Sequence, residues 1–84
     1  MTADTVPAID AVVLESLDLY VNAHLPPGGF LRAVLENDLA ASFTRADAAN
    51  QKALGDIVRY VYLNLPIASW GSKQKVAAWL NETE

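Results

Sequence analysis

The chain has no cysteine, a single histidine, and only six basic residues against ten acidic ones among its 84 residues. Without cysteine it can form neither a disulfide framework nor a thiolate metal site, and a lone histidine without spaced carboxylates makes a poor metal site. The formal net charge of −4 argues against holding DNA or RNA through bulk charge. We therefore expect no metal or other cofactor and no nucleic-acid partner.

Long apolar runs and targeting signals are also missing. No stretch approaches about 18 uncharged apolar residues, so we expect no membrane span. Residues 1–5 contain no lysine or arginine and no apolar run follows them, which is not the pattern of a signal peptide. Together with the absence of cysteine, which fits a reducing compartment, these features favour a cytoplasmic protein.

The sequence offers little for catalysis. His24 has no partner at the spacing of a catalytic pair, and no hydroxyl lies in a recognisable base-and-orienter setting. Glu36 and Asp38 are close in the sequence but lie on different faces of a helix, so their spacing does not make an acid/base pair. We expect that the protein is not an enzyme.

What the sequence does contain is 52% hydrophobic residues, recurring at helical spacing. We expect a single all-α domain over residues 1–84, with frayed tails at 1–6 and 82–84. Four helices are predicted: one from Pro7 or Ala8 to His24 or Leu25, one from Gly28 to about Phe43 with a weak spot at Asn37-Asp38, one capped by Asp47 that ends near Asn64, and a short one capped by Ser72. Short connections favour an up-and-down bundle of antiparallel neighbours.

The apolar stripes of the second and third helices predict most of the core. In the second helix the apolar positions are Phe30, Leu31, Val34, Leu35 and Leu39, with Ala41 and Phe43 trailing. In the third the buried stripe is Ala53, Leu54, Ile57, Val58, Val61 and Leu65. Gly55 costs about 1 kcal/mol relative to alanine in mid-helix, so we expect another backbone to pack closely against it. The high apolar content also indicates a subunit interface, and we expect a homo-oligomer.

The connection between the first two helices suggests a binding site. In an up-and-down bundle the Pro26–Gly29 turn and the Pro66–Ser72 linker lie at the same end, where two helix N-termini would point unpaired N–H groups at a phosphate or carboxylate. The predicted site consists of Pro27, Gly28, Gly29, Phe30, Arg32, Arg59, Trp70, Ser72 and Lys73. The alternative is purely architectural: a good turn, with Phe30 and Trp70 plugging the end of the bundle.

The run from Pro26 to Leu39, with Arg45-Ala46-Asp47, Asn50 and Trp70-Gly71-Ser72 leading to Trp79, resembles small all-helical proteins encoded by tailed phages and prophages. The resemblance covers roughly residues 14–80 and implies a protein that acts by binding in an infected bacterial cytoplasm and counters host defence. Three functions stay open. They are a non-enzymatic module acting by stoichiometric binding, a sponge that sequesters a phosphorylated small ligand such as a cyclic oligonucleotide signal, and an inhibitor of a host protein.

Overall fold

The structure, a computed structural model, describes residues 9–81, and their regular secondary structure is entirely helical. This confirms the all-α prediction. The elements are α1 (Ala11–Ala23), α2 (Gly29–Leu35), α3 (Leu39–Arg45), α4 (Ala48–Asn64), a 3-10 turn η1 (Ile67–Ser69) and α5 (Lys73–Leu80). The four-helix bundle is not confirmed, because the predicted second helix is two helices. The tails predicted at 1–6 and 82–84 lie outside the described residues.

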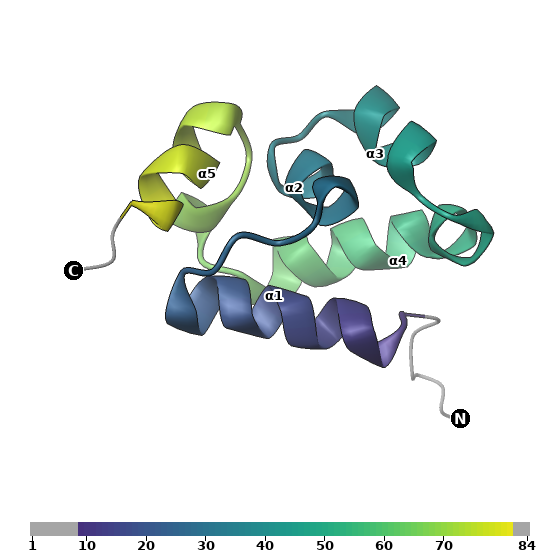
Figure 1. Cartoon of the computed structure of the whole chain (residues 1–84), viewed down its shortest axis with the longest axis horizontal. Coiled ribbons are helices and arrows are strands. Elements are labelled where there is room, and N and C mark those ends of the chain that lie inside the picture. The colour runs from purple at the N-terminus through teal and green to yellow at the C-terminus, as the bar shows by residue number, and fades with distance from the viewer. Residues whose placement is uncertain (1–8, 82–84) are drawn as a thin grey trace.

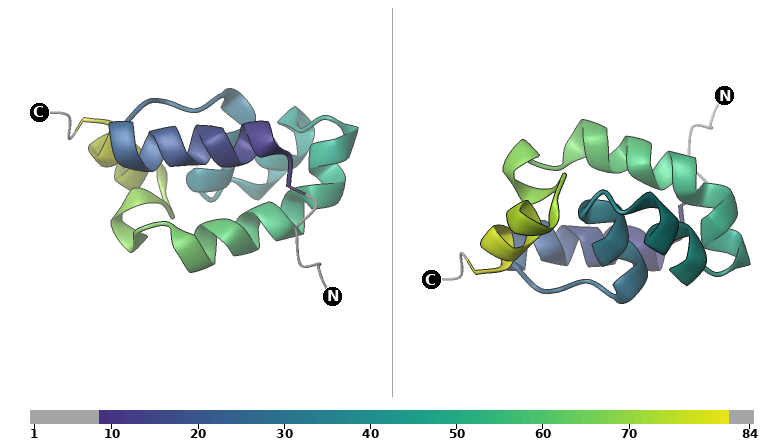
Figure 2. Two further views of the ribbon diagram at one scale, coloured as in Figure 1. Left: turned by 90° about the horizontal axis from the view of Figure 1, so that it is seen from below. Right: turned by 90° about the horizontal axis from the view of Figure 1, so that it is seen from above.

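The two longest helices form one layer of the molecule. α1 and α4 lie side by side and run in the same direction along the long axis (Figure 1). Seen from above, α2, α3 and α5 lie in front of α1 and of the space between the two long helices, and α4 stays in view along one edge (Figure 2). The stretch between α1 and α2 is extended and carries the chain back over the layer before α2 begins.

α1 begins later and ends more sharply than its apolar pattern suggests. The predicted start at Pro7 or Ala8 is wrong, because Ile9 and Asp10 are not helical and the Asp10 carboxylate caps the helix by accepting the N–H of Val12. At the other end His24 adopts a left-handed conformation with φ of 55°. The next residue precedes a proline and is therefore biased away from helix, so the predicted stop near His24 is confirmed.

The predicted second helix breaks at its weak spot. Asn37 has φ of 63°, a left-handed conformation that asparagine tolerates better than most residues. Directly after it, Asp38 accepts the N–H of Ala41 at 3.1 Å and starts a new helix. α3 therefore takes its own direction and is not a continuation of α2.

The later boundaries agree with the prediction. The carboxylate of Asp47 accepts the N–H of Asn50 at 2.8 Å, and the hydroxyl of Ser72 accepts that of Lys75 at 3.1 Å. The expected close packing at Gly55 is wrong, because a Cβ at this position would meet no atom of the described residues within 4 Å. Gly55 instead lies exposed in the middle of α4.

The core lies between the two layers. Every α-helix except α3 contributes large apolar side chains to it: Val13, Leu17 and Tyr20 from α1; Leu31, Val34 and Leu35 from α2; Ile57 and Val61 from α4; and Val76 from α5. α3 buries mainly Ser42. Consequently α3 carries apolar side chains that the core does not use.

Candidate functional site

The two helix N-termini of the predicted site do not lie together. The N–H of Gly71, beside the start of α5, donates to the carbonyl of Leu35 at 2.7 Å, which places it at the C-terminal end of α2. At the N-terminal end of α2, the carbonyl of Gly29 instead accepts a hydrogen bond from Arg45 at 3.3 Å. The prediction of a shared end is wrong because the extended 24–28 stretch returns the chain before α2 begins.

The basic residues of the predicted site are on separate elements. Arg32, on α2, forms an ion pair with Glu36 at 2.8 Å. Arg59 is exposed on α4, and Lys73 is exposed in the first turn of α5. Pro27 and Phe30 are half-buried, with Phe30 packed against the core. Binding of an anion by these residues stays a prediction, without the convergence of helix ends that motivated it.

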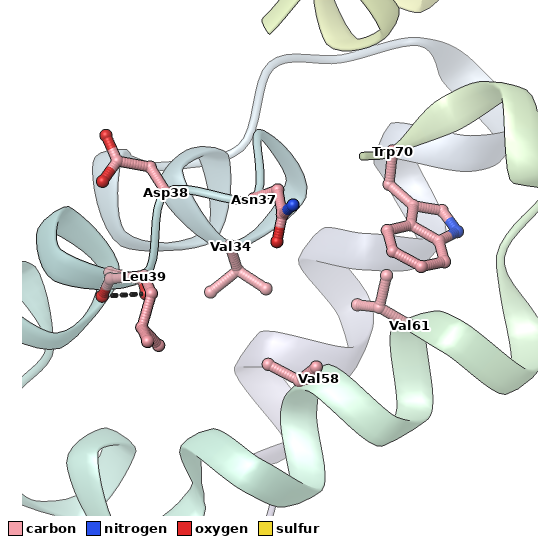
Figure 3. A pocket seen from close by; sticks show the side chains of 8 residues that line it. Val34, Asn37, Asp38, Leu39, Val58, Val61 and Trp70 are labelled. Carbon is pink, nitrogen blue, oxygen red and sulfur yellow. Dashed lines mark hydrogen bonds between the residues drawn. The ribbon is translucent and has the colours of Figure 1, made fainter. Parts of the chain in front are cut away.

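The structure forms a different cavity, which we call the α3–α4 cleft. It has a volume of about 160 Å³ and opens between the end of α2, the start of α3 and the middle of α4. Figure 3 shows Val34 and Leu39 pointing toward α4, which carries Val58 and Val61, with Trp70 at one side and the Asp38 carboxylate pointing away from this space. Its lining residues are Val34, Asn37, Asp38, Leu39, Ser42, Val58, Val61 and Trp70. Of the predicted site residues, Trp70 belongs to this set.

The floor of the α3–α4 cleft is apolar. Val34 and Val61 are buried members of the core. Trp70 is half-buried and forms a T-shaped contact with Tyr62, with ring centroids 6.0 Å apart. Its indole Nε1 is shielded from solvent and has no hydrogen-bond partner within residues 9–81. An apolar side chain entering the cleft would meet a preformed surface.

Exposed apolar side chains lie at the cleft and next to it on α3 and α4. Leu39 is 71% exposed and Val58 44%, and both line the cleft. Phe43, one turn after Leu39 on α3, is 50% exposed, and Tyr62, one turn after Val58 on α4, is 69% exposed. The prediction that Leu39, Phe43 and Val58 face the core is wrong. The break at Asn37 redirects α3, so its apolar stripe lies along the surface beside α4.

The polar groups of the cleft are few, and two of them are engaged within the protein. The Asp38 carboxylate caps α3 through one oxygen, and the Ser42 hydroxyl donates to the carbonyl of Leu39 at 2.8 Å. The lining contains one acidic residue and no lysine, arginine or histidine. Such a cleft suits apolar side chains and tolerates a cation at its rim, but a phosphate would meet a carboxylate without a compensating charge.

Two other kinds of feature are absent from the part of the chain that the structure describes. Within residues 9–81 no three histidine, aspartate or glutamate side chains are grouped to hold a metal ion. Among the helices of this range, none combines the length and apolar character that crossing a membrane requires. Comparison with protein-family models, curated proteins and solved structures finds no match to this chain.

Proposed function

We propose that the protein is a non-catalytic binding module that acts by stoichiometric contact with another protein, and that the α3–α4 cleft is its contact site. The observation that carries the proposal is the exposure of Leu39 and Val58 at the apolar floor of the cleft, with exposed Phe43 and Tyr62 one turn further along the same two helices. Contiguous apolar surface of this kind is typical of protein-interaction sites. It also explains why an 84-residue chain has 52% hydrophobic residues but a core that leaves α3 almost unused.

The charge of the chain favours a particular kind of partner. The whole chain carries a formal charge of −4, and the only ionisable side chain lining the cleft is the carboxylate of Asp38. Complementary charge speeds encounter and disfavours wrong partners. The occupant that fits is an apolar segment of another polypeptide, flanked by lysine or arginine. A second copy of this chain would bring another −4 toward the same surface, which makes it the weaker candidate.

The phage resemblance supplies a setting for the module, a bacterial cytoplasm in which a host protein is the partner. The sponge for phosphorylated ligands has less support, because Arg32 is paired with Glu36, Arg45 binds a carbonyl oxygen and the cleft contains no cation. Sequestration of a cyclic oligonucleotide would need those charges gathered in one pocket.

The test is a titration with a model peptide followed by NMR. The probe is an amphipathic helix with leucine on one face and lysine on the other, and its control has glutamate in place of every lysine. We expect the lysine peptide to shift the indole N–H resonance of Trp70 and the amides of Val58 and Leu39. Leu39→Ser should weaken binding about tenfold or more, because burying a leucine side chain is worth about 1.5–3 kcal/mol.

The matched control is Val12→Ser, which removes an equally exposed apolar side chain, 69% exposed, from α1. Equal losses in the two variants would mean general stickiness and would contradict the proposal. Perturbation confined to residues outside the cleft would contradict it too. Two further measurements separate the alternatives. Resonance shifts on addition of mono- or cyclic dinucleotides would favour the sponge. A sedimentation coefficient that rises with protein concentration would favour binding of a second copy of the chain.

A further inference from the structure

A second cavity lies between the two long helices. We call it the α1–α4 cleft; it has a volume of about 180 Å³ and is lined by Leu17, Asp18, Val21 and Asn22 from α1 and by Tyr60, Asn64 and Leu65 from the end of α4. Figure 2 shows these two helices side by side, with their C-terminal ends at the same end of the molecule. Val58 of the α3–α4 cleft and Tyr60 of the α1–α4 cleft point about 200° apart around α4. The two clefts therefore lie on different sides of this helix, and the inference below does not rest on the proposed function.

The polar groups of the α1–α4 cleft present acceptors. The side-chain NH₂ of Asn22 donates to Asp18 Oδ1 at 2.7 Å, and that of Asn64 donates to the carbonyl of Tyr60 at 3.0 Å. Each amide therefore uses one of its two N–H donors on the protein itself. Asp18 Oδ2 and the two amide oxygens accept no hydrogen bond from residues 9–81, so the cleft offers a carboxylate and two carbonyl-type oxygens to a ligand.

The helix ends add to this negative potential. α1 ends at Ala23 and α4 at Asn64, and neither helix has a basic residue in its last turn. The C-terminal end of a helix carries about half a negative charge, which a cation normally complements. No lysine, arginine or histidine lines the cleft, so the protein itself does not supply that cation.

The walls suit the stem that carries a cationic head group. Leu17, Val21 and Leu65 provide aliphatic surface, and Tyr60 provides an aromatic ring. Lysine and arginine side chains bury their methylene stems against apolar surface while the charged head stays near water and acceptors. A tyrosine ring attracts such a head group through its negative face.

From this combination we infer that the α1–α4 cleft binds an alkylguanidinium or alkylammonium group, supplied by an arginine or lysine side chain of a partner polypeptide. The stem lies against Leu17, Val21 and Leu65, and the head group reaches Asp18 and the oxygens of Asn22 and Asn64. Among the described residues a single carboxylate, that of Asp18, lines the cleft, so the site matches a ligand with one cationic head group. This favours a side chain over a free diamine, whose second ammonium would find no partner there.

The test is an NMR titration of the full chain with n-butylguanidinium, and n-butylurea serves as its uncharged isostere. We expect butylguanidinium to shift the amides of Asp18, Asn22 and Asn64 with a dissociation constant in the millimolar range, and butylurea to bind at least about fivefold more weakly. Putrescine should bind no more tightly than n-butylammonium. Binding of putrescine tenfold tighter would overturn the assignment to a side chain.

Two variants make the charge argument specific. Asp18→Asn should weaken butylguanidinium binding at least about fivefold. The control is Asp47→Asn, which changes the net charge equally and keeps a good N-cap. Asp47 lies 13 positions before Tyr60, which is about 20 Å along α4 and beyond the screening length of about 10 Å at 0.1 M salt. This variant should therefore change the affinity for butylguanidinium less than twofold. Equal losses in both variants, equal binding of butylurea, or no shift at tens of millimolar probe would each overturn the inference.

Discussion

Single residues decide where the helices of this protein begin and end. Asp10, Asp38, Asp47 and Ser72 each accept a backbone N–H of the first turn that follows. Each cap acts over two or three positions, which is why such boundaries are readable from neighbouring residues.

Gly55 is the residue whose role the structure leaves without an intramolecular explanation. It lies exposed in mid-helix, and a Cβ there would meet nothing within 4 Å among the described residues. We expect Gly55→Ala to stabilise the fold by about 0.5–1 kcal/mol and to raise the midpoint of thermal unfolding by roughly 4–8 °C per kcal/mol. Circular dichroism during heating measures this midpoint.

Gly71→Ala is the control for that change. Gly71 has φ of 120°, a conformation that alanine rarely adopts, so this variant should melt at a lower temperature than the parent protein. If Gly55→Ala also lowers the melting temperature, a second molecule packs against this face of α4. That result would support the predicted homo-oligomer.

At the level of whole elements, the break between α2 and α3 determines what the surface offers. The N–H groups of Asn37 and Asp38 still bond back to Val34 and Ala33 at 3.0 and 2.9 Å, so α2 closes with a hydrogen-bonded turn. The left-handed φ of Asn37 then sends the chain in a new direction. Without this turn, Leu39 and Phe43 would continue the buried stripe of α2.

The importance of this turn can be measured by substitution. Asn37→Ala should destabilise the protein by about 1–2 kcal/mol, because alanine pays the full cost of the left-handed conformation, whereas Asn37→Gly should be close to neutral. Urea unfolding of the three proteins gives the differences. Equal stability of the alanine and glycine variants would show that the conformation at Asn37 is not enforced.

At the scale of the molecule, a set of hydrogen bonds joins α1 to η1 and α5. The hydroxyl of Tyr20 donates to the carbonyl of Ser69 at 2.6 Å, and the indole N–H of Trp79 donates to the carbonyl of Tyr20 at 2.9 Å. His24 Nδ1 lies 2.7 Å from the carbonyl oxygen of Trp79, so this ring nitrogen carries the proton. These contacts span 49 to 59 positions of sequence and hold α5 against the end of α1.

The buried phenol of Tyr20 makes the free energy of unfolding depend on pH in the alkaline range. Burial raises the pKa of Tyr20 from 10.0 to about 12, an effect that the nearby Arg32 guanidinium opposes and Glu36 reinforces. The folded state holds this proton more tightly than the unfolded chain, so the stabilisation is complete below pH 10 and is lost as the pH rises through about 12. The loss should reach about 2–3 kcal/mol.

Tyr20→Phe tests this dependence. Below pH 10 the variant should be less stable than the parent by about 1–3 kcal/mol, because the carbonyl of Ser69 loses its buried donor. Urea unfolding at about pH 8 and about pH 11 should show that the difference shrinks at the higher pH, since phenylalanine has no proton to lose. A difference that stays constant would mean that Tyr20 ionises in the folded protein as readily as in the unfolded chain.

The predicted binding site illustrates where sequence reasoning stopped. Trp70, a residue of the predicted site, lines the α3–α4 cleft, but Gly28, Gly29 and Lys73 do not. The placement of those residues depended on an assumed up-and-down path, which the extended return between α1 and α2 does not follow. The weak spot at Asn37-Asp38 was the available signal for the cleft, although its consequence for Leu39 and Phe43 required knowing the direction of α3.

The sequence by itself determined the helical class, the caps at Asp47 and Ser72, the stop before Pro26 and most of the buried stripe of α4. These features follow from interactions between residues a few positions apart, whose strengths are set by local conformation and helical periodicity. Only the tertiary structure decided that Leu39 and Val58 face a cleft and that Asp18 and Asn64 share another. Those outcomes depend on which helix faces meet, and that is settled by packing between segments distant in the sequence.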